Sequence, residues 1–272
     1  MFDISTFILI SLFFIVSLSP SFPTFAILSI PVMEKVGEGK FKSTKERIEY
    51  TLVRWLQASG AEVIAIHTYT PKKELNEILE KVNGVILPGD NIKTELEGAY
   101  YNQAKKIYNK VIEMYNESQG KIKIPLLTIG NDVTLLGTFA SEMSHFIESL
   151  MQIWPNEVSF LNNTLAKNSI MFSELDEKDF RSMDFLHLVV NDLKFILSFA
   201  EFQNSYHLKN AYDVIAHSFC LYGRNYVSAL QSKEFPITGV TFRPEAIAFE
   251  QSGKVETSVG HKDSQTKGGL PG

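Results

Sequence analysis

The sequence predicts an α/β fold with three layers, α/β/α, around an open and mostly parallel sheet. Three observations favour this class. Short, largely apolar runs alternate strictly with amphipathic helical segments through the first half of the chain. These runs are apolar at nearly every position, as expected for strands that are buried on both faces. The chain has 272 residues, 44% hydrophobic and 21% charged, which is enough to bury a full core.

The first strand is expected over Thr24 to Ile30, a mostly apolar run that ends at Pro31. A helix is expected next, over Ser43 to Ser59, and Gly60 should end it because glycine accommodates the backbone that follows a helix. The inward face of this helix carries four apolar residues at helical spacing, namely Ile48, Leu52, Trp55 and Leu56.

Two further strand and helix pairs and one more strand complete the first half. They are a strand over Ala61 to His67, a helix over Pro71 to Lys81, a strand over Gly84 to Leu87 that runs into the Pro88-Gly89 turn, a helix over Ala99 to Ser118, and a strand over Lys123 to Ile129.

The second half alternates less regularly. Residues 156–197 mix short apolar runs with polar turns, so no element is assigned there. Beyond them, strands are expected over Tyr212 to Ile215, Asn225 to Leu230 and Phe235 to Phe242, where apolar and β-branched residues dominate.

The two ends of the chain differ from the part between them. Residues 1–21 contain an apolar run from Phe7 to Leu18 followed by small residues, which predicts a secretory signal peptide. The run is shorter than the roughly 20 residues that span a bilayer. Because Asp3 is present and no Lys or Arg precedes the run, a signal anchor or a buried first strand are the alternatives. Residues 251–272 are polar and glycine-rich, which predicts a disordered tail after a single domain over 22–250.

A signal peptide places the chain in the secretory pathway, with no membrane span left after cleavage. Two sequons, Asn116-Glu117-Ser118 and Asn162-Asn163-Thr164, are then candidate glycosylation sites.

Composition excludes several functions. The chain has 26 Lys and Arg against 31 Asp and Glu, and no basic cluster is interleaved with aromatic residues, so a nucleic-acid partner is not expected. Cys220 is the only cysteine, which rules out an internal disulfide and a thiolate metal cluster. His187 and His207 have no suitable neighbour for a metal pair. We therefore expect no metal and no cofactor.

Functional groups of open parallel sheets gather at the carboxyl ends of the strands. In this chain those positions are Gly89-Asp90-Asn91, after the third expected strand, and Gly130-Asn131-Asp132, after the fourth. We expect the site to lie there.

Three segments carry a recognisable pattern. They are Asn83-Gly84-Val85-Ile86-Leu87-Pro88-Gly89, the stretch from Pro125-Leu126-Leu127 to Leu135-Leu136, and the segment from Phe235 to Glu245. In this order they resemble the gamma-glutamyl hydrolase family, a secreted, lysosomal or vacuolar group within the class I glutamine-amidotransferase-like hydrolases. The similarity extends from about residue 23 to about residue 250. It implies a flavodoxin-like sheet, a cysteine nucleophile with a histidine base, and hydrolysis of γ-glutamyl bonds in folate polyglutamates.

The resemblance fails at the catalytic base. The last strand of the family ends in His-Pro-Glu, whereas this chain has Arg243-Pro244-Glu245. An arginine keeps its proton at any working pH and cannot act as a base. Glu245, the acidic partner, is retained and could pair with Arg243 as a charge-assisted fork. Arg243 then either neutralises Glu245 or offers a cation to a carboxylate-rich ligand.

The resemblance also fails at the nucleophile. An alignment without gaps between Pro125 and Leu135-Leu136 places Gly130 at the cysteine position. A register shifted by two residues places Asp132 there instead. Neither residue has a thiolate that could attack a carbonyl carbon.

The resemblance assigns four substrate-binding positions. The counterparts of the oxyanion hole are Gly89, Asp90 and Asn131, whose backbone N–H groups survive a change of side chain. Asp90 places a carboxylate where negative charge should develop, which is the wrong sign for the reaction. A substrate-binding histidine of the family corresponds to Leu193, in Asn191-Asp192-Leu193.

Other candidate residues have plainer interpretations. His67 follows the end of a strand and could line the cleft, although a hydrogen-bonded structural histidine is the better interpretation. Cys220 is expected to be a small buried residue and not a substitute nucleophile. His217 precedes it by three residues, and on a strand this spacing sends the two side chains to opposite faces.

Three functions remain open. The first is a catalytically inactive homologue that binds γ-glutamyl or folate-like ligands in the inherited cleft. The second is an interaction or structural protein that docks on a partner, such as a second copy or an active paralogue. The third is a residually active hydrolase that uses a water molecule or Asp132.

Overall fold

The computed structural model describes residues 22–37, 40–89, 98–141, 146–148, 154–156, 158–161, 163–185, 189–191, 193–220 and 223–249. The expected signal peptide, the expected tail and Asp90 lie outside these residues, so their interpretation stays a prediction. Within the described ranges, no helix is both long enough and apolar enough to cross a membrane.

Eight of the described strands form one sheet at the centre of the fold. Five strands run parallel, and three antiparallel strands extend the sheet at one side. In spatial order they are β4 (Glu62–Ile66), β1 (Thr24–Leu28), β5 (Gly84–Leu87), β6 (Leu126–Ile129), β14 (Ile237–Val240), β13 (Asn225–Ser232), β12 (Tyr212–Phe219) and β9 (Ser159–Phe160). The predicted open, mostly parallel sheet is confirmed.

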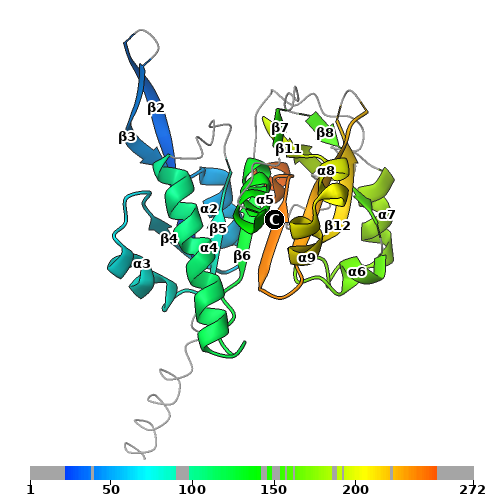
Figure 1. The fold of residues 1–272 in the computed structure, drawn as a ribbon, viewed down its shortest axis with the longest axis horizontal. Helices are drawn as coiled ribbons and strands as arrows, with labels where there is room; N and C mark the ends of the chain where they lie inside the picture. The colour runs from blue at the N-terminus through cyan, green and yellow to red at the C-terminus, as the bar shows by residue number, and fades with distance from the viewer. Residues whose placement is uncertain are drawn as a thin grey trace, which may run out of the picture.

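Helices cover both faces of this sheet, as the three-layer prediction requires (Figure 1). One core lies between the sheet and α3 (Lys72–Leu79), α4 (Ala99–Glu117), α5 (Val133–Ser141), α8 (Phe199–Asn204) and α9 (Tyr206–Ala211). The other lies between the sheet and α2 (Tyr50–Ala58), α6 (Asn163–Lys167) and α7 (Glu177–Phe185). The last helix, α10 (Pro244–Phe249), packs against α2.

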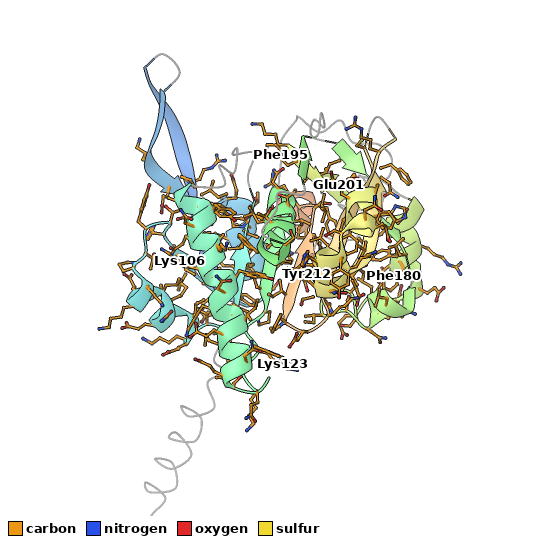
Figure 2. The ribbon with its side chains drawn as sticks, viewed as in Figure 1. Lys106, Lys123, Phe180, Phe195, Glu201 and Tyr212 are labelled. Atoms are coloured by element: carbon orange, nitrogen blue, oxygen red, sulfur yellow. The ribbon has the colours of Figure 1, made fainter. Side chains whose placement is uncertain are left out.

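Strand β1 shows why the strand sequences are apolar throughout. Ala26 and Leu28 face the α4 side, whereas Ile27 between them faces the α2 side, and all three are fully buried. Burying one large aliphatic side chain stabilises a fold by roughly 1.5 to 3 kcal/mol, so a polar residue at any of these positions would be unfavourable. Tyr212 belongs to the core on the α4 side and Phe180 to the core on the α2 side, and both are labelled in Figure 2.

The predicted helix over Ser43 to Ser59 is wrong in its first part. The helix begins at Tyr50, and the residues before Ile48 belong to strand β3 (Lys40–Arg47). This strand pairs with β2 (Ile30–Gly37) in a hairpin that projects from the body of the molecule (Figure 1). The five residues over 43–47 are polar and have no apolar periodicity. Pairing across the hairpin therefore decides their conformation.

The irregular second half forms short elements. Two small two-stranded sheets pair β10 (Val189–Asn191) with β8 (Trp154–Asn156), and β11 (Phe195–Leu197) with β7 (Phe146–Glu148). The three expected strands beyond them are present, although β12 extends to Phe219 and β14 begins only at Ile237.

Candidate functional site

Three neighbouring parallel strands end at one edge of the sheet and bring the predicted site residues together. Strand β6 lies between β5 and β14, with Leu87 beside Thr128 and Ile129 beside Val240. The chain therefore leaves β5 at Gly89, β6 at Gly130 and β14 toward Arg243 along the same edge. The carboxyl edge of a parallel sheet is where ligand sites of this fold class lie.

The turns after β5 and β6 are in direct contact. A Cβ atom added to Gly89 would lie 2.0 Å from the carbonyl oxygen of Ile129 and 2.8 Å from the backbone nitrogen of Asp132. Gly89 also has a φ of +49°, which is strained for residues with a side chain. Only glycine fits here, so the Pro-Gly turn of the sequence is a packing requirement between two adjacent turns.

Gly130 stands at a sharp turn from strand to helix. It has a φ of +65° and begins a short 3₁₀ turn, η1 (Gly130–Asp132), that leads directly into α5. In α/β hydrolases a strained turn of this type presents the nucleophile at the edge of the sheet. Gln119 is the only non-glycine residue with a positive φ in the described part of the chain. Asp132 therefore does not have the positive φ of Gly130.

Asp132 is fully buried two residues further on. The hydroxyl of Tyr100, from the first turn of α4, donates a hydrogen bond to its carboxylate. The carboxylate also lies at the N-terminal end of α5, where negative charge is favourable. These contacts give Asp132 a role in joining α4 to the turn after β6.

Asn131 holds a distant segment against the same turn. Its side-chain oxygen Oδ1 accepts hydrogen bonds from the backbone N–H groups of Lys194 at 2.8 Å and Phe195 at 3.0 Å. This places the beginning of β11, including the labelled Phe195 in Figure 2, beside the candidate site. Leu193 precedes these residues, and its side chain is completely buried with Ile196. Leu193 therefore contributes packing at a position that the resemblance assigns to substrate binding.

Arg243 and Glu245 form the expected ion pair. The Nε atom of Arg243 lies 2.9 Å from Oε1 of Glu245, and the side chains are 19% and 4% exposed. Arg243 precedes the first residue of α10, and Glu245 lies in its first turn. A cation held by a buried carboxylate thus lies at the position that the resemblance assigns to the base.

Cys220 lies at the same end of the sheet but has different surroundings. It follows the end of β12, is 8% exposed, and packs with Leu193, Ile196 and Tyr226. The imidazole of His217 lies between aromatic rings, with centroid distances of 5.8 Å to Phe199 and 5.4 Å to Phe219. Within the described part of the chain, no hydrogen bond connects Cys220 to a histidine.

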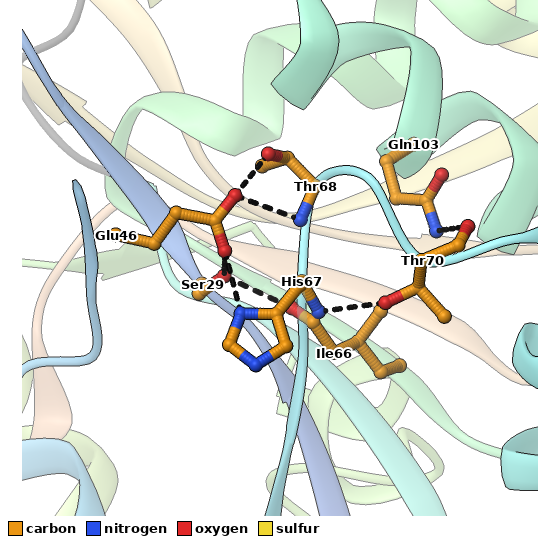
Figure 3. A network of polar contacts seen from close by, with 7 residues as sticks. All are labelled: Ser29, Glu46, Ile66, His67, Thr68, Thr70 and Gln103. Carbon is orange, nitrogen blue, oxygen red and sulfur yellow. Dashed lines mark hydrogen bonds and ion pairs between the residues drawn. The ribbon is translucent and has the colours of Figure 1, made fainter. Parts of the chain in front are cut away.

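Sequence reasoning missed a second polar cluster, centred on Glu46 (Figure 3). Its Oε2 atom accepts a hydrogen bond from Ser29 Oγ at 2.6 Å and lies 2.7 Å from Nδ1 of His67. Its Oε1 atom accepts from the backbone N–H of Thr68 at 3.0 Å and from the Thr68 hydroxyl. Ser29 follows β1 and His67 follows β4, so Glu46 fastens the base of the hairpin to both strand ends. His67 is hydrogen-bonded, as the preferred interpretation predicts.

The hydrogen bonds decide the charge of Glu46. Burial raises its pKa, but the hydrogen bonds from Ser29, Thr68 and His67 together outweigh burial, and the net effect lowers the pKa below the ordinary value. Because an ionised carboxylate only accepts hydrogen bonds, Nδ1 of His67 must carry the proton, which leaves Nε2 on a ring with 68% of its side chain exposed. No pattern in the sequence indicates this cluster, because its members come from three separate segments.

Comparison with known proteins identifies the family. No family model matches the chain. Gamma-glutamyl hydrolase 2 of Arabidopsis thaliana is 28% identical over 229 residues, covering 84% of this chain and 64% of that protein. Gamma-glutamyl hydrolase of Mus musculus is 23% identical over 215 residues, covering 75% of this chain and 62% of that protein. The chain is a homologue of the gamma-glutamyl hydrolases. It spans a little under two thirds of the length of these relatives.

A solved structure supports the fold of this gamma-glutamyl hydrolase homologue. The crystal structure of a Thermoplasma acidophilum protein, described as part of a GMP synthase, superposes with a TM-score of 0.52 at 13% identity. The match covers 83% of this chain and 85% of that one. At this identity it shows the fold alone, which is the α/β fold that the sequence predicts. Roles for Gly130, Arg243 and the other site positions stay predictions.

Proposed function

We propose that this gamma-glutamyl hydrolase homologue binds γ-glutamyl compounds at the carboxyl edge of its sheet and does not hydrolyse them. One observation carries the proposal. At the edge where strands β5, β6 and β14 end, the position that the resemblance assigns to the nucleophile holds Gly130, and the one it assigns to the base holds Arg243. A thiol attack needs both a thiolate and a proton acceptor, and neither residue can provide one.

The absence of the nucleophile and the base should lower the rate of hydrolysis greatly. Loss of either the nucleophile or the base of a catalytic pair typically removes several orders of magnitude in kcat, because the two groups act as a unit. A hydrolase that uses Asp132 in their place is disfavoured, since its buried carboxylate receives the hydroxyl of Tyr100 and lies within the turn.

Ligand binding requires less than catalysis. The backbone N–H groups at the turn after β6 do not depend on the side chain at position 130. Arg243 adds a partly exposed guanidinium, a group suited to carboxylates, and a glutamyl chain carries several. These two features favour a γ-glutamyl ligand, such as a folate polyglutamate, over a neutral peptide.

Two measurements on the purified chain test the proposal. We expect no release of glutamate from a folate polyglutamate, and a rise in melting temperature when the same compound is titrated, because a ligand of the native state stabilises it. Turnover comparable to that of Gamma-glutamyl hydrolase 2 would contradict the loss of hydrolysis. The absence of a melting shift at high ligand concentration would contradict binding.

Restoring the expected cysteine and histidine tests more sharply whether their absence abolishes hydrolysis. We expect the double substitution Gly130→Cys with Arg243→His to release glutamate, and Gly130→Cys alone to release much less. The cysteine side chain will be accommodated with some strain, because φ at position 130 is +65° and a Cβ there would lie 3.3 Å from the carbonyl oxygen of Gly89. A folded double variant without any activity would show that more than these two groups has been lost.

The secretory pathway is proposed as the destination of the chain, because the apolar run after Asp3 has the length of a signal peptide. Expression of the full chain with a C-terminal tag tests this proposal. Recovery from the medium, with sensitivity to an endoglycosidase, is the expected outcome, and exclusive recovery from the cytosol is the contrary one.

A further inference from the structure

A cavity of about 310 Å³ lies beside the candidate site. It is lined by residues from the end of β11, the start of α8 and the turn before β13, namely Ile196, Ser198, Phe199, Ala200, Arg224 and Asn225. Asn131 connects the cavity to the site. Its side-chain oxygen accepts a hydrogen bond from the N–H of Phe195 at 3.0 Å, and the next residue, Ile196, lines the cavity. Strand β13 is antiparallel to β14, so Asn225 at its beginning lies at the same edge of the sheet as Arg243.

The walls of this cavity are mostly apolar. Ile196 and Phe199 supply a branched and an aromatic surface, and His217 lies behind Phe199 with 5.8 Å between the ring centroids. Ligand cavities commonly measure about 300 to 1,000 Å³ and combine apolar walls with a few polar groups. This one is at the small end of that range, so it suits a ligand with a single ring. Phe199 offers such a ring an aromatic partner.

Three polar side chains around the cavity are not used by the rest of the described chain. Arg224 is exposed and forms no ion pair with any described residue. Ser198 precedes α8, but its hydroxyl does not cap the helix. The amide oxygen Oδ1 of Asn225 is buried and has no hydrogen-bond donor. A buried polar atom without a partner is unusual and costs roughly 1 to 3 kcal/mol.

We propose that this cavity binds a small aromatic carboxylate. The ring lies against Ile196 and Phe199, and the carboxylate pairs with the guanidinium of Arg224, where the Ser198 hydroxyl is a further donor. Arginine suits a carboxylate because its N–H groups form a planar fork. A flip of the Asn225 amide places its Nδ2 group, a donor, where the unpaired oxygen lies, so that it donates to the carboxylate of the ligand. The proposal is independent of the proposed function, since the ligand contains no γ-glutamyl group.

Calorimetric titration of the full chain with phenylacetate, and with its neutral isostere phenylacetamide, tests the charge of the ligand. We expect phenylacetate to bind more tightly than the amide. Arg224→Gln should lower the affinity for phenylacetate about tenfold and change that for the amide little. Arg54→Gln is the matched control, because Arg54 is an exposed arginine on α2, over the ring of Tyr50, and far along the chain from the cavity. Equal affinity of the chain and of Arg224→Gln for phenylacetate, or no binding of either probe, would overturn the proposal.

A second variant tests the place of binding. Ala200 lines the cavity and is exposed, so Ala200→Trp adds volume without burying a new group in the core. We expect this variant to bind neither probe, while circular dichroism shows an unchanged melting temperature. Binding of phenylacetate to a folded Ala200→Trp variant with unchanged affinity would place the ligand elsewhere and overturn the proposal.

Discussion

The Nε atom of Arg243 lies 2.9 Å from Oε1 of Glu245 and joins the end of β14 to the first turn of α10. Glu245 is buried and the guanidinium is only 19% exposed, so the two charges compensate each other away from most of the solvent. The pair explains how a cation is tolerated at the position that the resemblance assigns to a histidine. It also means that either residue alone is unfavourable without the other.

Glu245→Gln keeps the shape of the side chain and removes its charge. We expect this variant to lower the free energy of unfolding by about 2 to 3 kcal/mol, because the guanidinium of Arg243 loses its charged acceptor. Urea unfolding at pH 7 measures the change, with the exposed Glu234→Gln as control. In the double variant with Arg243→Gln, the loss of unfolding free energy should be smaller than the sum of the losses in the two single variants. Strictly additive losses would contradict a stabilising interaction between Arg243 and Glu245.

The Glu46 cluster predicts a stability that depends on pH. The pKa of Glu46 is lowered below 4.5 in the folded chain, so its carboxylate stabilises the fold at higher pH, and this contribution is lost as the pH falls through the folded pKa. We expect the stability difference between the chain and Glu46→Gln to be constant near neutral pH and to shrink below about pH 4.5. Urea unfolding across this range measures it. Glu62→Gln, at an exposed position on β4, is the control, and a difference for Glu46→Gln that does not vary with pH would exclude the mechanism.

The contact between the two turns predicts an unequal effect of two glycine substitutions. Gly89→Ala places a Cβ atom 2.0 Å from a backbone oxygen, so we expect a loss of several kcal/mol or a failure to fold. Gly60→Ala is the matched control, because Gly60 also has a positive φ, of +81°, but a Cβ there has no neighbour within 4 Å. Only strain of about 1 kcal/mol should remain for it. Similar melting temperatures for the two variants would contradict the packing of the turns.

The hydrogen bond from Tyr100 to Asp132 predicts that the stability of the fold depends on the hydroxyl of Tyr100. Tyr100→Phe removes a donor from a fully buried carboxylate, so we expect the free energy of unfolding to fall by about 2 kcal/mol. Tyr101→Phe is the control, since the neighbouring ring packs on Phe139 and its hydroxyl forms no hydrogen bond with a described residue. Denaturant unfolding compares the two, and equal losses would show that the hydroxyl of Tyr100 contributes nothing.

The predicted elements were most accurate where an apolar pattern extended over a whole element. The run over Ala26 to Leu28 and the inward face of α4 each bury their apolar residues as the spacing requires. The hairpin was missed because the polar residues over 43–47 have no periodicity, and only pairing with β2 makes them a strand. In the candidate site, too, residues in local motifs could be predicted and residues brought in by the fold could not. Gly89, Gly130 and Arg243 could be named from local motifs, whereas Tyr100 and Phe195 reach the site from elsewhere in the chain.

By itself, the sequence determined the α/β class, and it predicts a site at one edge of the sheet with Gly130 and Arg243 in place of the expected thiol and imidazole. These conclusions depend on side-chain chemistry and on short-range spacing, both of which can be read along the chain. Only the tertiary structure decided that Asn131 binds the segment after Leu193, that Glu46 fastens the hairpin, and that Arg224 lies at a cavity. The physical reason is that each of these contacts joins residues far apart in sequence, and their proximity results from the packing of the sheet and its two helical layers.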